Sequence, residues 1–357
     1  MKSYNFCAGP ATLPFEVYQE ASQAVIDYNQ SGLSILEISH RSDDFIQILE
    51  DSKNRVLQLM QLDANLYSVL FLQGGATMEF YRLSQNFLFP ASKAAYINTG
   101  VWSQKAIDAA KFSGSVIEIA SSKNENYRYI PSDFDIYESY NYLHITSNNT
   151  IYGTQYQSFP DVDVPIVADM SSDIFSRSID YSQFAMIYAG VQKNLSPAGM
   201  SLIVIEKQFL DRFSNILPPI IDYKQHIKNE SMLNTPPVFP IYVSNLTMQW
   251  IQKQGGISKI EAKNNEKAKI LYDEIDRNPL FFGHAEIKDR SKMNALFYLK
   301  NEEMSSIFEK LCQEASIKNL KGHRTSGGYR ASMYNALDVE AVKILVEIMQ
   351  SIEKYHG

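Results

Sequence analysis

The chain has 357 residues, of which 45% are hydrophobic and 20% charged, so it is long enough for two domains and has the composition of a globular enzyme. Its net charge of -7 and its scattered basic residues argue against nucleic acid as a partner. The apolar runs are too short for a signal sequence or a membrane span, and Cys7 and Cys312 form no disulfide framework or metal pattern, so we expect a cytoplasmic protein without a membrane contact or a metal site.

The first two thirds of the chain alternate between short apolar runs and helical patterns. The expected strands are 67–72, 94–98, 115–120, 142–146, 165–169, 184–188 and 201–205. Helical patterns cover 77–87 and 102–112. Buried strands separated by helices predict an α/β fold with a mostly parallel sheet covered on both faces.

The last third has a different organisation. A helical run at 241–254 ends at Gly255-Gly256, and a long charged amphipathic helix follows at 257–276. The remaining expected elements are a strand at 294–299, a helix at 304–315, a strand at 329–333 and a helix at 339–355. We therefore expect a large domain over 15–255 and a smaller α+β domain. The smaller domain consists of 256–357 together with the N-terminal residues 1–14.

An acid and a lysine follow two of the predicted strands. Asp169 closes one strand, and Lys193 lies just past another, before a Ser-Pro-Ala-Gly turn. Ligands of parallel sheets bind beyond the carboxyl ends of the strands, which is where both residues fall. A lysine amine can condense with the aldehyde of pyridoxal phosphate, and a carboxylate can keep the pyridine nitrogen protonated. A surface lysine and a helix-capping aspartate are the ordinary alternatives for each residue alone, and the two together favour the cofactor.

Three further positions could assist a cofactor. The turn Gly74-Gly75-Ala76-Thr77 stands between a strand and a helix, where helix N–H groups suit a phosphate. Trp102 opens a helix and could stack on a flat ring, and Thr150 lies in a polar loop after a strand. A plain turn, core packing and turn chemistry explain each of them equally well when taken singly.

A second group of side chains suits anions. His40 and Arg41 occur in EISHRS, and GHRTSGGYRAS supplies His323, Arg324 and Arg330. Arginine binds carboxylate and phosphate through two parallel hydrogen bonds, so this set fits a doubly anionic substrate. Surface ion pairing with the acidic excess is the alternative for any one of these residues.

These motifs together resemble the phosphoserine aminotransferase family of fold-type I, class V pyridoxal-phosphate enzymes. The similarity runs almost end to end, through NFCAGPATLP, EISHRS, FLQGGATMEF, NTGVWS, ADMSSDIFSRSID, YAGVQKNLSPAG, MLNTPPVFPIY and KGHRTSGGYRASMYNA. It implies a large domain with a seven-stranded, mostly parallel sheet and a smaller C-terminal domain. It also implies the reversible conversion of L-glutamate and 3-phosphohydroxypyruvate into 2-oxoglutarate and O-phospho-L-serine in serine biosynthesis.

The resemblance assigns roles to the residues that match the family's motifs. Lys193 would bind the cofactor covalently, Asp169 would hold the pyridinium, Trp102 would stack on the ring and Thr150 would contact the phenolic oxygen. The residues implied at the cofactor phosphate are Ala76, Thr77 and Gln192, with Asn234 and Thr235 of the neighbouring subunit. The residues implied at the substrate anions are His40, Arg41, His323, Arg324 and Arg330.

The resemblance further implies a homodimer with active sites at the subunit interface, and activity towards the related four-carbon intermediate of pyridoxine biosynthesis. Which arginine takes the carboxylate and which the phosphate stays open. Two positions depart from the pattern: some relatives have arginine where this chain has Thr77, and many have glycine where it has Ser196. A neutral Thr77 would leave helix N–H groups and the neighbouring subunit to hold the cofactor phosphate.

Three other functions are alternatives for this sequence. A cysteine desulfurase of the same fold needs a mobile cysteine and usually a histidine before the lysine, and here Gln192 precedes Lys193. A class V transaminase acting on serine or alanine would not need so many arginines. A nucleotide-binding or regulatory protein would need a Gly-x-Gly-x-x-Gly turn or a phosphate loop, and the sequence has neither.

Overall fold

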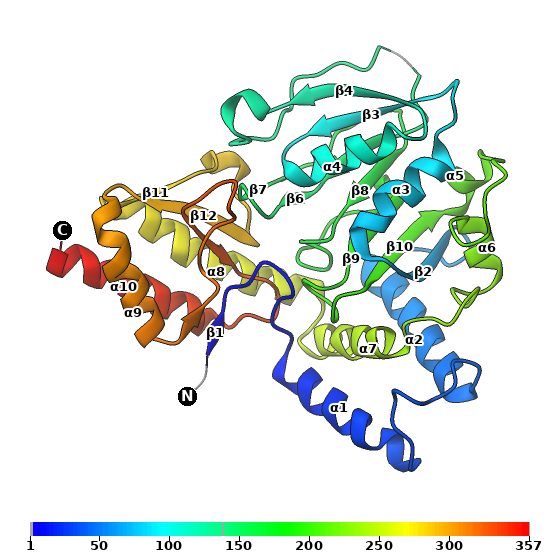
Figure 1. Ribbon diagram of the computed structural model, residues 1–357, viewed down its shortest axis with the longest axis horizontal. Coiled ribbons are helices and arrows are strands. Elements are labelled where there is room, and N and C mark those ends of the chain that lie inside the picture. Colours follow the sequence, from blue (N-terminus) through cyan, green and yellow to red (C-terminus); the bar gives the residue numbers. More distant parts are fainter. Residues whose placement is uncertain (1–2, 138, 357) are drawn as a thin grey trace.

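The computed structural model describes residues 3–137 and 139–356. Its centre is a seven-stranded sheet with the order β2-β10-β9-β8-β5-β3-β4 (Figure 1). These strands are β2 Tyr67–Gln73, β3 Lys93–Asn98, β4 Ser115–Ser121, β5 Leu143–Thr146, β8 Ile166–Asp169, β9 Met186–Gly190 and β10 Met200–Glu206. The sheet is parallel from β4 to β9, and β10 is antiparallel to both β9 and β2. The predicted mostly parallel sheet is confirmed.

Alternation of side chains along these strands buries both faces of the sheet. On one face Val69, Ile145 and Ala168 pack with α2 (Asp43–Met60) and α7 (Val238–Lys253). On the other face Leu70, Tyr96 and Val167 pack with the helices α3 (Gly75–Phe87) and α4 (Val101–Ala110). The apolar runs read as strands are therefore buried on both sides, as expected of a sheet covered by helices.

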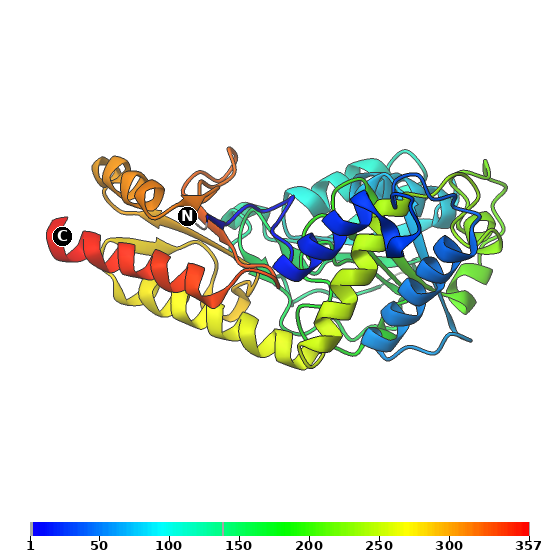
Figure 2. The same cartoon turned by 90° about the horizontal axis from the view of Figure 1, so that it is seen from below.

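Shorter elements complete the large domain. They are α1 Phe15–Ile26, η1 Tyr28–Gln30, η2 Lys123–Glu125, the hairpin strands β6 Asn148–Asn149 and β7 Thr154–Gln155, η3 Tyr181–Gln183, α5 Lys207–Asp211 and α6 Tyr223–Lys228. Helix α1 packs on α7 through Leu13, Val17 and Val243 (Figure 2). The sequence pattern did not reveal α1 or α2.

A smaller α+β unit follows. The antiparallel sheet β11-β12-β14 carries three helices, α8, α9 and α10, and lies beside the large sheet (Figures 1 and 2). The bounds are α8 Ile257–Arg277, β11 Phe281–Gly283, η4 Ile287–Asp289, β12 Asn294–Leu299, η5 Glu302–Met304, α9 Ser305–Glu314, β13 Ile317–Lys318, β14 Tyr329–Ser332 and α10 Val339–His356. The four elements expected after residue 276 are thus present within one or two residues.

The N-terminal segment returns to this smaller unit. Strand β1 (Tyr4–Asn5) pairs in parallel with β13, and Phe6 is fully buried in the apolar cluster of α8, β12 and α10. The division into 15–255 and 256–357 with 1–14 stays a prediction. The first residues of α8, Ile257 and Ile260, still pack with the large sheet, so α8 ties the two units together. In the described part of the chain, no helix is long and apolar enough to cross a membrane.

Candidate active site

The chemically important side chains gather where three parallel strands end. In register, Thr146 of β5 lies opposite Asp169 of β8, and Asp169 lies opposite Tyr188 of β9. Lys193 follows the end of β9 by three residues. Parallel strands place their carboxyl ends on one edge, so the acid and the lysine meet there.

Lys193 is a buried lysine with an unengaged amine. Its side chain is 8% exposed, and its Nζ atom makes no hydrogen bond to any described residue. The pKa of Lys193 is lowered to about 8, chiefly by burial; Asp169 opposes this change and the charge of Arg330 adds to it. A large fraction of this amine is therefore uncharged, and nucleophilic, at slightly alkaline pH.

Asp169 is held in one orientation by the turn that follows it. Its Oδ1 atom accepts hydrogen bonds from the Ser171 N–H at 2.9 Å and the Ser171 hydroxyl at 2.6 Å. Oδ2 has no hydrogen-bond partner among the described residues. Burial raises the pKa of Asp169, while Lys193 and the two Ser171 bonds act in the opposite direction. The acid is thus oriented, desolvated and free to bind a cationic group through Oδ2.

A cavity of about 210 Å³ lies between the two residues. It is lined by Gly74, Gly75, Ala76, Thr77, Trp102, Thr146, Asn148, Asp169, Ser171, Ser172, Gln192, Lys193, Ala198 and Gly199. Six residues proposed from the sequence are in this set. Thr146 adds a buried hydroxyl that has no hydrogen-bond partner among the described residues, so the cavity offers a polar ligand an unused bond.

The rim of the cavity at the start of α3 is built for close approach. Gly74 has φ +113°, and a Cβ atom there would lie 2.5 Å from the Cβ of Met78. A Cβ on Gly190 would lie 3.3 Å from the Ala76 nitrogen. These glycines let the first turn of α3 sit against the end of β9, with its free N–H groups at the cavity. Such a turn suits a phosphate group.

Trp102 forms the aromatic wall. The Nζ atom of Lys193 lies 5.7 Å from the centre of the Trp102 ring. The indole Nε1 donates to the Thr150 hydroxyl at 2.9 Å, which fixes the plane of the ring. Arg330 lies beyond Thr150, with Nη1 3.5 Å from the Thr150 carbonyl oxygen, and its Nε has no partner among the described residues. Thr150 and Arg330 thus adjoin the cavity without lining it.

Other residues proposed from the sequence are not among the described residues that line this cavity. His323 and Arg324 lie in the loop before β14, where the charges of Arg330, Arg324 and Lys105 add to burial in lowering the pKa of His323. His40 and Arg41 lie in the turn before α2, with the Arg41 N–H bound to the Ser39 hydroxyl. Asn234 and Thr235 are exposed, and the Thr235 carbonyl accepts from Gln73 Nε2 at 2.6 Å.

Several functional residues were missed by sequence reasoning. Ser171 orients Asp169 and also accepts from the Gly190 N–H at 2.9 Å, so it joins β8 to β9. Asn194 uses its amide to donate to the Ser172 and Ile174 carbonyls and to accept from the Asn335 N–H, which anchors the residue after Lys193. The serines after Asp169 were a visible signal, but they were taken only as a reason why Asp169 could cap a helix.

The cavity fits pyridoxal phosphate. It provides an amine whose pKa is lowered to about 8, an aromatic wall and a helix N-terminus. It also provides a carboxylate oxygen and a buried Thr146 hydroxyl, both without a partner among the described residues. Lys193, Asp169, Trp102 and the 74–77 turn are the groups that would hold it. These are the residue types that such a cofactor requires.

Known proteins with similar sequences and folds point the same way. A family model described as aminotransferase class-V matches residues 3–345. The phosphoserine aminotransferase of Flavobacterium psychrophilum is 52% identical over 353 residues, covering 99% of both chains. The structure of phosphoserine aminotransferase from Bacillus circulans subsp. alkalophilus has a TM-score of 0.96 at 39% identity, covering 100% of this chain and 99% of the other. A pyridoxal-phosphate-bound phosphoserine aminotransferase from Trichomonas vaginalis has a TM-score of 0.92 at 35% identity, covering 98% and 100% of the two chains.

Proposed function

This chain belongs to the phosphoserine aminotransferase family of the class-V aminotransferases, and we propose that it transfers an amino group reversibly from L-glutamate to 3-phosphohydroxypyruvate, giving O-phospho-L-serine and 2-oxoglutarate. The reaction is a pyridoxal-phosphate-dependent transamination that serves serine biosynthesis. The observation that carries the proposal is the unengaged, buried amine of Lys193 facing one cavity with Asp169.

Each residue of the site has a physical task. Bound pyridoxal phosphate supplies an aldehyde that condenses with amines and a ring that accepts electrons. Lys193 would hold the aldehyde, and its amine would move the proton at the substrate α-carbon. Asp169 keeps its buried charge next to the ring nitrogen and so holds that nitrogen protonated.

The remaining side chains position the cofactor. Trp102 stacks on the ring, and Thr150, which already fixes the indole plane, contacts the phenolic oxygen. Ala76, Thr77 and Gln192 bind the phosphate at the start of α3, where helix N–H groups compensate for the neutral Thr77.

The substrate anions are bound by the basic residues. Arg330 is held near Lys193 at the inner end of the site, and the charge of Arg330 acts on both Lys193 and His323. We assign Arg330 to the inner end of a doubly anionic substrate, and His323 and Arg324 to its outer end. All three belong to the chain that carries Lys193. Arg41 and His40 are assigned to the same substrate from a second copy of the chain.

A homodimer with shared sites is part of this proposal. Asn234 and Thr235 reach the cofactor phosphate of the other subunit, which accounts for their exposure next to Gln73 at the end of β2. Met78, Tyr81 and Phe112 are exposed apolar side chains on and beside α3 and α4, in line with an interface there. The two free cysteines support a reducing, cytoplasmic location.

One assay tests the reaction. Initial rates of amino transfer from L-glutamate are compared for 3-phosphohydroxypyruvate and unphosphorylated hydroxypyruvate. We expect kcat/KM to be at least about 100-fold higher for the phosphorylated acid, because several charged hydrogen bonds to the phosphate are lost without it. Equal rates would instead support a serine or alanine transaminase. Colourless protein that cannot be reconstituted with the cofactor would support a binding protein.

A mixing experiment tests the shared sites. A Lys193→Ala variant and an Asn234→Ala/Thr235→Ala variant are unfolded, mixed and refolded together. Half of the randomly formed dimers then hold one intact site, so roughly a quarter of the wild-type rate returns. No recovery beyond the two variants alone would mean that each site is built from one chain.

A further inference from the structure

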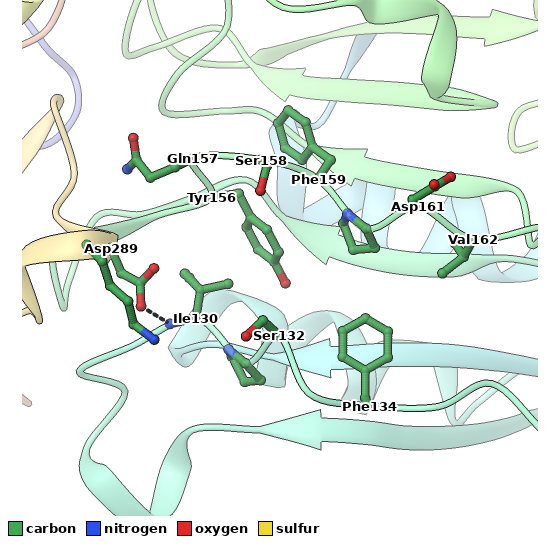
Figure 3. Close-up of a pocket in the computed structure, with 13 residues that line it drawn as sticks. Ile130, Ser132, Phe134, Tyr156, Gln157, Ser158, Phe159, Asp161, Val162 and Asp289 are labelled. Atoms are coloured by element: carbon green, nitrogen blue, oxygen red, sulfur yellow. Dashed lines mark hydrogen bonds between the residues drawn. The ribbon is translucent and has the colours of Figure 1, made fainter.

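Figure 3 shows a second cavity, of about 350 Å³. It shares no lining residue with the cavity at Lys193. Three segments enclose it: the loop 130–134 before β5, the loop 156–162 after β7, and the turn 288–289 of η4. The η4 turn and the first loop are joined by a hydrogen bond of 3.0 Å from the Ile130 N–H to Asp289 Oδ2. The cavity therefore lies where the smaller unit meets the large one.

Tyr156 presents an unused hydroxyl to this cavity. The residue is 2% exposed, and its Oη atom has no hydrogen-bond partner among the described residues. Figure 3 shows the phenol end pointing into the space between the two loops, towards Ser132 and Phe134. A buried hydroxyl without a partner is costly, so it marks a position where a bound molecule would gain a hydrogen bond.

Part of the lining is flat and apolar. Phe134 lines one side, and the Tyr156 ring stacks on Phe159 with centroids 6.0 Å apart and an interplanar angle of 17°. Pro131 and Pro160 complete the lining. Aromatic and proline surfaces suit a planar ring, and the volume exceeds the roughly 150 Å³ of a cavity that holds benzene. The space is large enough for one ring with a short substituent.

One end of the cavity is acidic. Asp289 is 9% exposed, and only its Oδ2 atom is engaged, by Ile130. Burial raises the pKa of Asp289, and the charge of Lys288 acts in the opposite direction. Lys288 is mostly exposed, and its Nζ lies 3.8 Å from Glu286. Asp289 forms no salt bridge with another described residue, so its Oδ1 atom can accept the cationic group of a ligand.

We propose that this cavity binds a small molecule in which a single hydroxylated aromatic ring is joined by a short chain to an ammonium group. The ring packs between the aromatic and proline walls, its hydroxyl bonds to Tyr156 Oη, and the ammonium group pairs with Asp289. The site is separate from the transaminase cavity, and the inference does not rest on the proposed reaction.

Three probes with the same ring test the proposal on the holoenzyme by calorimetry. N,N-dimethyltyramine carries the cation and, as a tertiary amine, cannot condense with the cofactor aldehyde; phenol is neutral and 4-hydroxyphenylacetate is anionic. We expect N,N-dimethyltyramine to bind with a Kd of about 1 mM or tighter. Phenol should bind at least about tenfold more weakly, and the anion more weakly still.

Two variants locate the binding. Tyr156→Phe should weaken the binding of N,N-dimethyltyramine about fivefold without lowering the thermal midpoint, because the lost hydroxyl has no partner among the described residues. Asp289→Asn keeps an oxygen for the Ile130 N–H and should remove the preference for the cation over phenol. Asp163→Asn, the same change at an exposed position outside the cavity, is the matched control and should alter neither result.

Three outcomes would overturn the proposal. One is the absence of binding by all probes up to about 10 mM, well above the expected Kd. Another is equal affinity for the cation, the neutral ring and the anion. The third is a crystal structure of the soaked protein in which only an ordered water bonds to Tyr156 Oη.

Discussion

Two buried lysines lie in different regions of the molecule and differ in what surrounds the amine. Lys193, at the strand edge of the large sheet, faces a cavity and makes no hydrogen bond to a described residue. Lys267, on α8, is 1% exposed and donates to the Met333 and Tyr334 carbonyls at 2.9 and 2.7 Å. Burial lowers the pKa of both, to about 8 for Lys193 and about 7 for Lys267.

Burial alone therefore does not make a lysine reactive. The Lys267 amine is surrounded by packed protein and donates hydrogen bonds to two carbonyls just after β14. The Lys193 amine has open space beside it and an oriented acid, Asp169, across that space. Chemistry needs the space and the acid as much as it needs the shifted pKa.

The largest effect is expected for Lys193→Ala. Transamination should fall by more than about 10³-fold, since both the covalent attachment and the proton transfer at the substrate are lost. The Lys193 amine makes no hydrogen bond to a described residue. Without added cofactor, the variant and the wild type should therefore have similar circular dichroism spectra and thermal midpoints. Measured turnover within tenfold of wild type would show that another group does this work.

The second-largest effect on activity is expected at Asp169, the acid across the cavity from Lys193. Asp169→Asn should lower kcat by about 10²- to 10³-fold, because the amide cannot hold the cofactor nitrogen protonated. The Ser171 bonds can still form with the amide oxygen, so the turn is kept. Ser171→Ala is a matched variant that removes one of the two bonds orienting the acid and should cost less. A kcat for Asp169→Asn equal to wild type would remove the acid from the mechanism.

A smaller effect is expected from Arg324, one of the cations assigned to the substrate. Arg324→Ala should raise the apparent KM for 3-phosphohydroxypyruvate about 10-fold or more, the size of one charged hydrogen bond to phosphate, and the KM for L-glutamate much less. Lys263→Ala removes a cation beside Lys267 instead and should change neither constant. Equal rises in both KM values for Arg324→Ala would mean that it does not bind the phosphate.

The sequence predicted the part of the site that depends on neighbours in the chain. Asp169 and Lys193 are marked by the strands that precede them, and the glycines at 74–75 by the turn that they form. The positions of Arg41 and Asn234 depend on distant segments, and in the proposed dimer on a second chain, so no local pattern fixes them. Ser171 and Asn194 act through hydrogen bonds between strands that are far apart in the sequence.

The sequence contains a pattern that indicates the burial of Lys267, but this pattern was not used. The buried positions Ile260, Asn264, Lys267 and Leu271 recur at helical spacing, so the lysine lies on the inner face of α8. The region was correctly predicted as an amphipathic helix, but a lysine within a charged helix is ordinarily exposed. Its burial depends on the approach of residues 333–334 from the end of β14, which only the tertiary fold provides.

The smallest effect on activity is expected for Lys267→Met, which should keep transamination within about threefold of wild type because the amine touches neither cavity.

The main effect of Lys267→Met is on stability, and it depends on pH. The folded pKa of Lys267, about 7, lies below the value of 10.5 for an exposed lysine, so the unfolded chain binds more protons between these values. The contribution of Lys267 to the free energy of unfolding therefore rises with pH across that window and is least favourable below pH 7. Urea unfolding at pH 7 and pH 9 gives the free energy of unfolding of wild type and variant. From pH 7 to pH 9, the value for the wild type should rise by about 1–3 kcal/mol more than the value for the variant. Parallel changes in the two proteins would mean that the carbonyl bonds keep Lys267 charged throughout, and the contrast with Lys193 would then be one of protonation as well as of space.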